Sequence, residues 1–164
     1  MTRRLTWLAV IFAGVVAVAH PVTDLVGVWE FQKEISTKAD GSVADVPAVA
    51  YDGLLIYTAD GHVSVIVMPK GRKWNAETAT LQELRDSIVE GAATGYAGRY
   101  EVDAKAGTVT HILAVSLDPG DHGQRLVRHY TIKGDTLTLS GNWSYQGAAL
   151  RFTVYWKRAK PATK

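Results

Sequence analysis

The chain has 164 residues, 47% of them hydrophobic and 21% charged, which suits one globular domain with a hydrophobic core and is too apolar for a disordered chain. It has no Cys, so disulfides, thiolate chemistry and a lipid anchor on Cys are excluded. Because 18 basic residues nearly balance 16 acidic ones, nucleic acid and strongly anionic membranes are not expected partners.

The N-terminus has the order of a secretory signal peptide. Arg3 and Arg4 give a basic start, an apolar run follows, and Ala17-Val18-Ala19 is a small-x-small cleavage site. We therefore expect residues 1–19 to be removed on export and residues 20–164 to form a single domain. An uncleaved anchor is the less favoured alternative, because the apolar run is shorter than the ~20 residues of a spanning helix.

The rest of the chain predicts an all-β fold of short strands separated by turns. Asp60-Gly61 and Gly134-Asp135 are signals for two-residue hairpin loops, and Thr37 to Pro47 is expected to be a mobile loop. Antiparallel pairing of eight strands in succession favours a closed up-and-down barrel, which can hold one small ligand. The expected strands are 26–36, 52–58, 61–68, 96–103, 108–117, 123–133, 136–144 and 149–158.

One segment between the third and fourth expected strands predicts a short helix. Thr80 to Glu83 is a capping box, and Leu81, Leu84 and Ile88 form an apolar stripe at helical spacing. We expect a helix over about 80–90 that either closes one end of the barrel or covers the outside of the preceding hairpin.

That hairpin, residues 53–68, is apolar on both faces, whereas a half-exposed strand should alternate apolar and polar residues. A two-residue loop would place Leu54, Ile56, Thr58, Val63, Val65 and Val67 on one face, with Leu55, Tyr57, Ile66 and Met68 on the other. The sequence leaves open which face lines the interior, and whether the helix or a second subunit of a homo-oligomer covers the other.

The register of the later hairpins follows from their turns. It pairs Tyr100 with His111, Tyr130 with Leu139, and Gly141 with Phe152, all on the more apolar face. A slip of one residue would turn that face to solvent, so the pattern specifies the register.

Several stretches resemble the lipocalins, and more closely the bacterial and fungal lipocalin-like domains. Gly27-Val28-Trp29 resembles the Gly-x-Trp signature of the first lipocalin strand, and Arg158 stands where the terminal Arg of that superfamily stacks on the Trp. GLLIYTADGHVSV, GYAGRYEVDAKAGTVTH and DTLTLS resemble the narrower group. The chain departs from it at His62, where Tyr is frequent, and at Ile112, where a second His is frequent. The resemblance covers most of residues 25–158 and implies a barrel that binds a small molecule.

The predicted interior combines a polar cluster with apolar walls. Tyr100, His111 and Arg128 share one face on neighbouring strands. An inward Arg must be paired or hydrogen-bonded, so the cluster is either a structural network or an anchor for a carboxylate or phenolate. The candidate ligand-binding residues are Tyr100, His111, Arg128, Tyr130, Leu113, Leu139, Phe152 and Val154.

No catalytic motif, nucleotide fingerprint or metal-ligand spacing is present, so neither a cofactor nor a metal is expected. We expect an exported binder of a small hydrophobic or anionic amphipathic ligand, without a membrane span after cleavage. An isomerase or cyclase is an open alternative, with Tyr100 and His111 moving a proton and Arg128 stabilising an enolate-like charge. Weaker alternatives are heme binding through His111 and, after a turn slip, a metal pair of His111 and His129.

Overall fold

The structure is a computed structural model that describes residues 22–38, 40–47, 50–72, 77–78, 80–83, 93–145 and 148–161. The expected signal peptide and residues 84–90 of the expected helix lie outside these ranges. The capping box itself is described: the Thr80 hydroxyl accepts from the Glu83 backbone N–H at 3.2 Å, and Leu81 to Glu83 form one helical turn.

Within the described ranges, no helix is long and apolar enough to cross a membrane.

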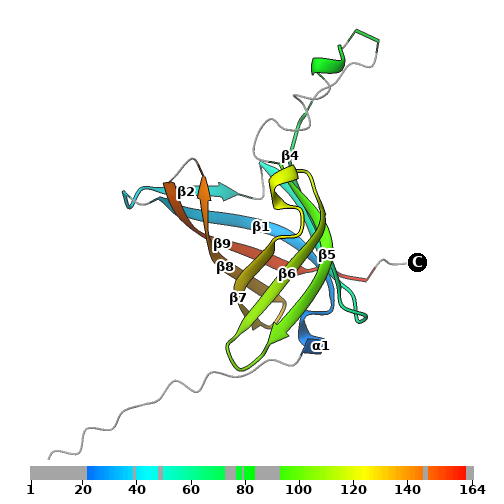
Figure 1. Cartoon of the computed structure of the whole chain (residues 1–164), viewed down its shortest axis with the longest axis vertical. Helices are drawn as coiled ribbons and strands as arrows, with labels where there is room; N and C mark the ends of the chain where they lie inside the picture. The colour runs from blue at the N-terminus through cyan, green and yellow to red at the C-terminus, as the bar shows by residue number, and fades with distance from the viewer. Residues whose placement is uncertain are drawn as a thin grey trace, which may run out of the picture.

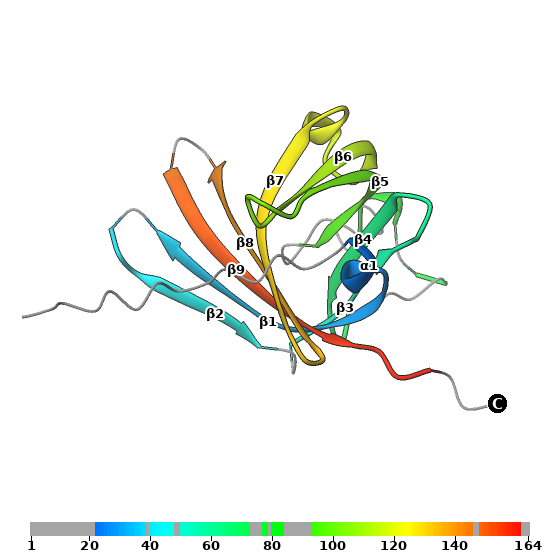
Figure 2. The same cartoon turned by 90° about the horizontal axis from the view of Figure 1, so that it is seen from below.

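The strands form one antiparallel sheet that curls until its first long strand pairs with its last (Figures 1 and 2). Eight strands close the barrel, as predicted, and the short β2 extends the sheet beside β1. The elements are α1 (Val22–Leu25), β1 (Gly27–Lys38), β2 (Val43–Pro47), β3 (Tyr51–Tyr57), β4 (His62–Pro69), β5 (Thr94–Asp103), β6 (Thr108–Ser116), the 3-10 turn η1 (Pro119–Asp121), β7 (Arg125–Lys133), β8 (Thr136–Tyr145) and β9 (Ala148–Arg158).

The strand β2 corrects the expectation of a mobile loop over Thr37 to Pro47. It pairs with the second half of β1, from Lys33 opposite Pro47 to Thr37 opposite Val43. The first half of β1 pairs with β3 on the same side, so β2 and β3 share one edge of β1 while β9 occupies the other.

The register predicted for the hairpin 53–68 is wrong by one residue. The Thr58 backbone N–H donates to the His62 carbonyl at 2.9 Å, and Gly61 has a φ of 89°. This is a three-residue loop with a glycine in the left-handed region, so Tyr57 pairs with Val63. A one-residue shift exchanges the faces. Leu55, Tyr57, Val63 and Val65 are therefore buried inside the barrel, whereas Leu54 and Ile66 are exposed outside it.

The predicted registers of the later hairpins are confirmed, including Tyr100 opposite His111, Tyr130 opposite Leu139, and Gly141 opposite Phe152. A β-bulge interrupts the β5–β6 ladder between Ala97 and Gly98. A Cβ atom on Gly98 would lie 1.9 Å from the Ile112 carbonyl oxygen, so this close approach of two strands requires glycine.

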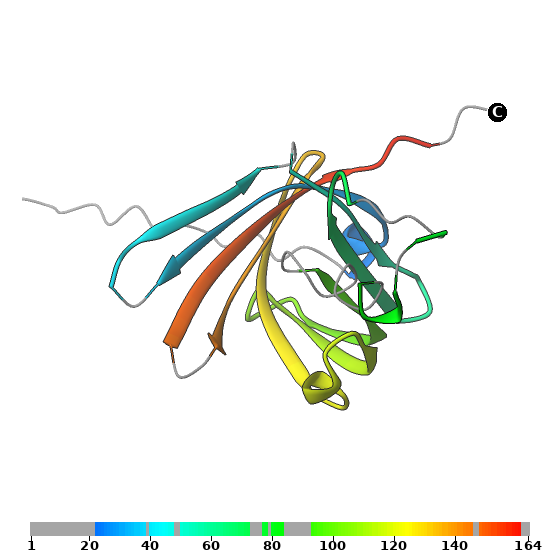
Figure 3. The same ribbon diagram turned by 90° about the horizontal axis from the view of Figure 1, so that it is seen from above.

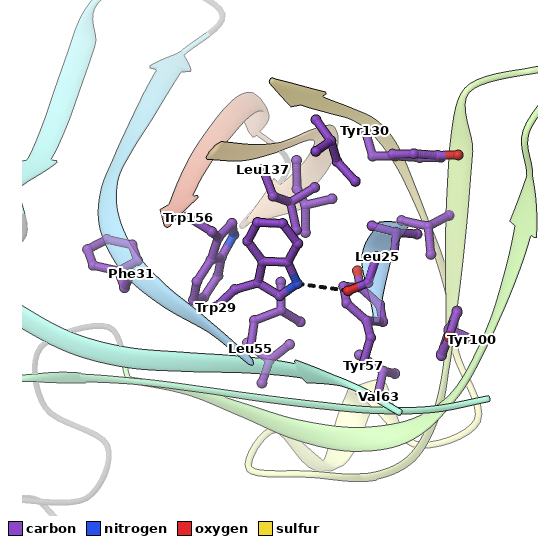
Figure 4. Packing of buried hydrophobic residues seen from close by; sticks show 14 residues of the cluster. Leu25, Trp29, Phe31, Leu55, Tyr57, Val63, Tyr100, Tyr130, Leu137 and Trp156 are labelled. Carbon is purple, nitrogen blue, oxygen red and sulfur yellow. Dashed lines mark hydrogen bonds between the residues drawn. The ribbon is translucent and has the colours of Figure 1, made fainter. Parts of the chain in front are cut away.

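Trp29 fills the end of the barrel that α1 covers, and none of its surface is exposed. Its indole N–H donates to the Leu25 carbonyl at 2.8 Å, and Figure 4 shows its ring between Trp156 and Leu25. The Arg158 guanidinium lies 4.0 Å from the ring centroid and donates to the Val26 and Asp24 carbonyls at 3.0 and 2.7 Å. The expectation that Trp29 is buried beside Arg158 is confirmed.

Gly27 of the Gly-x-Trp motif is required on two grounds. Its φ of 136° lies in the region that favours glycine, and a Cβ atom there would lie 2.9 Å from a guanidinium nitrogen of Arg158. The motif thus leaves space for the Arg that covers Trp29.

Replacing Trp29 with Ala should lower the free energy of unfolding by about 3–5 kcal/mol, because it removes a fully buried aromatic side chain. Urea unfolding measures the change. The matched control is Val28→Ala on the exposed side of the same strand, which should change stability far less. Equal effects of the two substitutions would contradict the assigned role of Trp29.

Candidate ligand-binding site

The candidate ligand-binding residues all lie in the barrel wall, and six of the eight are buried. Tyr100, Tyr130 and Leu139 belong to the hydrophobic core, and Val154 packs against it. His111, Leu113 and Phe152 are also buried, whereas Arg128 is half-buried.

The polar cluster is centred on His111, but its partners differ from those predicted. The Tyr57 hydroxyl lies 2.6 Å from Nε2 of His111, and the Tyr96 hydroxyl lies 2.9 Å from Nδ1. Tyr57 ends β3, Tyr96 is near the start of β5, and His111 lies in β6. The three side chains therefore connect separate strands across the interior.

Tyr100 is not part of this hydrogen-bond network, although it pairs with His111 in the ladder. Its hydroxyl donates to the Thr58 carbonyl at 2.9 Å, and its ring packs edge-on against Tyr57 with the centroids 4.9 Å apart. The Tyr100 hydroxyl thus binds the β3–β4 loop and not His111. Tyr96 could have been found from the sequence, because Tyr96 and Tyr100 point to the same face of a regular strand.

Arg128 lies on the inward side of β7, since it alternates with the buried Tyr130 and Ile132. Its guanidinium carbon is 4.7 Å from the ring centroid of Phe152. The salt bridges within the described residues are His62–Asp60, Lys70–Asp52 and Arg125–Glu101, and none includes Arg128.

Gly141 makes room for the ring beneath Arg128. A Cβ atom on Gly141 would lie 2.9 Å from the tip of the Phe152 ring. A larger residue there would displace the Phe152 ring, over which the Arg128 guanidinium lies.

At neutral pH Arg128 carries a charge, whereas the His and Tyr side chains of the cluster do not. Burial, and then the charge of Arg128, lowers the pKa of His111 to about 3. Burial raises the pKa of Tyr96 to about 12, although the charge of Arg128 and a hydrogen bond with it act in the opposite direction. Burial likewise raises the pKa of Tyr57 well above its usual value. The His and both Tyr side chains are therefore neutral.

Two further polar residues face the interior, and sequence reasoning missed both. A bulge between Phe31 and Lys33 shifts the alternation of β1, so that Glu34 stands opposite Val154 and Ser36 opposite Phe152. The Ser36 hydroxyl donates to a Glu34 carboxylate oxygen at 2.7 Å. No sequence signal marks this bulge.

Trp156 presents a buried donor without a partner. Its indole nitrogen forms no hydrogen bond with the described residues, and its side chain is 3% exposed. Trp156 alternates with Val154 and Phe152 on the inward side of β9. A buried N–H without an acceptor is costly, so this donor favours a ligand or water inside the barrel.

A hollow of about 360 Å³ lies beside Arg128, where β7 and β8 separate. Their pairing is recorded from Lys133 opposite Thr136 to His129 opposite Ser140, and Figures 2 and 3 show the two strands diverging beyond it. The lining residues are Arg125, Leu126, Val127, Arg128, His129, Gly141 and Asn142. A second hollow, of about 320 Å³, lies over β3 to β6.

The geometry does not fit the metal and heme alternatives. Both ring nitrogens of His111 are hydrogen-bonded to Tyr hydroxyls, which leaves no free nitrogen for iron. His129 is exposed and pairs with Thr108, so it does not stand opposite His111. The described part of the chain has no cluster of three His, Asp or Glu side chains that could hold a metal.

These features define a small antiparallel barrel, plugged at one end by a Trp under an Arg, with a polar cluster inside. Residues 26–159 match the lipocalin-like domain family, and the chain belongs to that family. The resemblance seen in the sequence is confirmed.

No curated protein matches the chain. Among solved structures, it is similar to the chain in "Structure of EF1p2_mFAP2b bound to DFHBI", with 11% sequence identity and a TM-score of 0.48. The match covers 86% of this chain and 98% of that one.

Protonation of His111 should destabilise the barrel in acid. Its pKa is about 3 when folded, against 6.5 for an ordinary His, so between these values the unfolded chain binds a proton that the folded one does not. The free energy of unfolding therefore falls as the pH drops from 6.5 towards 3, by at most about 1.4 kcal/mol per pH unit. Urea unfolding at stepped pH measures the slope.

The slope is assigned to His111 by comparing two variants between pH 6.5 and 5, above the range where most carboxylates titrate. His111→Gln should flatten it, whereas His129→Gln, which changes an exposed His on β7, should leave it as in the native chain. A slope unchanged in His111→Gln would refute the assignment.

Proposed function

We propose that the protein binds a small hydrophobic or amphipathic ligand in the open part of its barrel, and that it does so as an exported protein. Membership of the lipocalin-like family supports the barrel interior as the binding region. The interior of a closed eight-stranded barrel is wide enough for one small molecule.

The two ends of the barrel differ in a way that favours a ligand at one of them. At the α1 end, Trp29, Leu55 and Tyr57 are almost completely buried. Further along the same inward face, Val67, Tyr96 and Val154 pack against the core but stay partly exposed. An apolar wall that is partly accessible is the common setting of a small-molecule site.

The single observation that carries the proposal is the environment of Arg128. It faces inward over Phe152 and has no ion-pair partner within the described residues. A half-buried guanidinium is a strong, geometrically specific donor to a carboxylate. An apolar ligand with an anionic head group would form an ion pair with Arg128 and pack its apolar part against the surrounding wall.

Titration with dodecanoate and its methyl ester tests the proposal. The native protein should bind dodecanoate more tightly, and Arg128→Met should weaken dodecanoate about tenfold to hundredfold while leaving the ester nearly unchanged. This range corresponds to losing a charge-assisted hydrogen bond of about 1.5–3 kcal/mol.

The matched control is Arg99→Met, because Arg99 is an exposed Arg on β5 that lines neither of the two hollows. It should change neither affinity. Equal binding of both ligands, unaffected by Arg128→Met, would make Arg128 a structural residue. Failure of the native chain to bind either ligand would refute the proposed ligand class.

Export predicts a shortened chain in the native host. The intact mass of the protein purified from that host should correspond to residues 20–164. A mass that includes Met1 to Ala19 would contradict cleavage at this site.

A further inference from the structure

We infer that Tyr96 is a second anchor of the site, and that its hydroxyl donates to the ligand carboxylate beside Arg128 because the Tyr57–His111 pair orients it. The inference rests on the proposed function and deepens it. It adds a specificity-determining residue and commits the head group to a carboxylate, whose two oxygens can accept from two donors.

The buried Tyr57 hydroxyl needs an acceptor for its hydrogen. The Tyr57 side chain is 1% exposed, and Nε2 of His111, at 2.6 Å, is the acceptor that the described residues offer its hydrogen. A buried hydroxyl that donates to nothing costs about 1–3 kcal/mol. Tyr57 therefore donates to Nε2, which must carry no hydrogen.

The tautomer of His111 follows from the direction of the Tyr57 hydrogen bond. The ring is fully buried and neutral at pH 7, and a neutral imidazole has one N–H and one bare nitrogen. With Nε2 bare, the hydrogen is on Nδ1 and is donated to the Tyr96 oxygen at 2.9 Å. The opposite tautomer would leave the Tyr57 hydrogen buried without an acceptor.

Tyr96 retains its own hydroxyl hydrogen. Its oxygen accepts from His111, and the positive charge of Arg128 acts on the same hydroxyl. No acceptor for the Tyr96 hydrogen is found among the described residues. Tyr96 lies nearer the open end than Tyr57, because it pairs with Ser116 near η1 and its side chain is half-buried. Its O–H is thus available to a ligand.

Tyr96 and Arg128 together present two donors to one acceptor group. An anion is attracted by the Arg charge and accepts from both side chains, whereas an ester lacks the charge and binds Arg more weakly. Two acids oppose this attraction. Asp121 acts on Tyr96 through its charge, and Glu34 faces the interior from β1. Neither forms a salt bridge with Arg128 within the described residues.

Binding experiments test Tyr96 with a variant that keeps the ring. Tyr96→Phe should weaken dodecanoate about tenfold and leave the methyl ester within about threefold. The control is Tyr155→Phe on β9, whose ring lies on the outward side of the strand under the Lys33 ammonium group. It should leave both affinities close to native. Glu34→Gln should strengthen dodecanoate binding, because it removes an inward negative charge.

The tautomer is tested on the ligand-free protein. A long-range ¹H–¹⁵N spectrum of His111 should show a protonated Nδ1 and a bare Nε2. A protonated Nε2 would overturn the proposed donor directions of the Tyr57–His111–Tyr96 hydrogen bonds, whatever the ligand.

The outcomes separate the inference from the proposed function. If Arg128→Met weakens dodecanoate but Tyr96→Phe does not, the inference fails and the proposed function stands. If the native protein binds neither ligand, both fail. Loss of dodecanoate binding in Tyr96→Phe, with the ester and the melting temperature unchanged, supports the anchor.

Discussion

The closed barrel depends on the contact between Trp29 and Arg158. The guanidinium covers the indole ring and also donates to two carbonyls just before β1, so one side chain of the last strand holds both the first strand and α1. A cation over a desolvated indole is favourable, and the donors satisfy carbonyls near a chain reversal. The contact adds to the backbone ladder that joins β1 and β9, two strands far apart in sequence.

Two bulges interrupt the regular pairing of the barrel strands. The bulge opposite Ala97 and Gly98 places the extra residue Ala114 in β6, while the bulge in β1 turns Glu34 and Ser36 inward after Phe31. Each is a local irregularity that bends a strand and re-aims its side chains. Glu34 and Ser36 thus reach the interior through a departure from regular pairing. Tyr57, His111 and Arg128 reach it from regularly paired stretches.

Much of the fold was predictable because, in the later hairpins, the turn residues and the alternation of apolar and polar residues indicate the same register. At Gly134-Asp135, for example, one register alone places Tyr130, Leu137 and Leu139 together on the apolar face. At Asp60-Gly61 they did not agree, since both faces are apolar and the loop has three residues. That one-residue error concealed Tyr57, whose hydroxyl contacts His111.

The candidate site was predictable in part for the same reason. His111 and Arg128 were found because they lie on strands with regular pairing. Tyr100 was assigned to the cluster from its register, yet register determines the face of a side chain and not where its hydroxyl ends. The inward position of Glu34 could not be predicted, because no sequence signal in β1 indicates the extra residue of the bulge before it.

The strand β2 gives the molecule a feature that a closed barrel otherwise lacks. It is the outermost strand of the sheet, so one row of its backbone amides and carbonyls faces away from β1. Such a row is a template for strand addition by another molecule. Here the template is five residues long and ends in Pro47, which has no amide hydrogen to donate. A strand added at this edge would therefore meet a short ladder whose last residue cannot donate a backbone hydrogen bond.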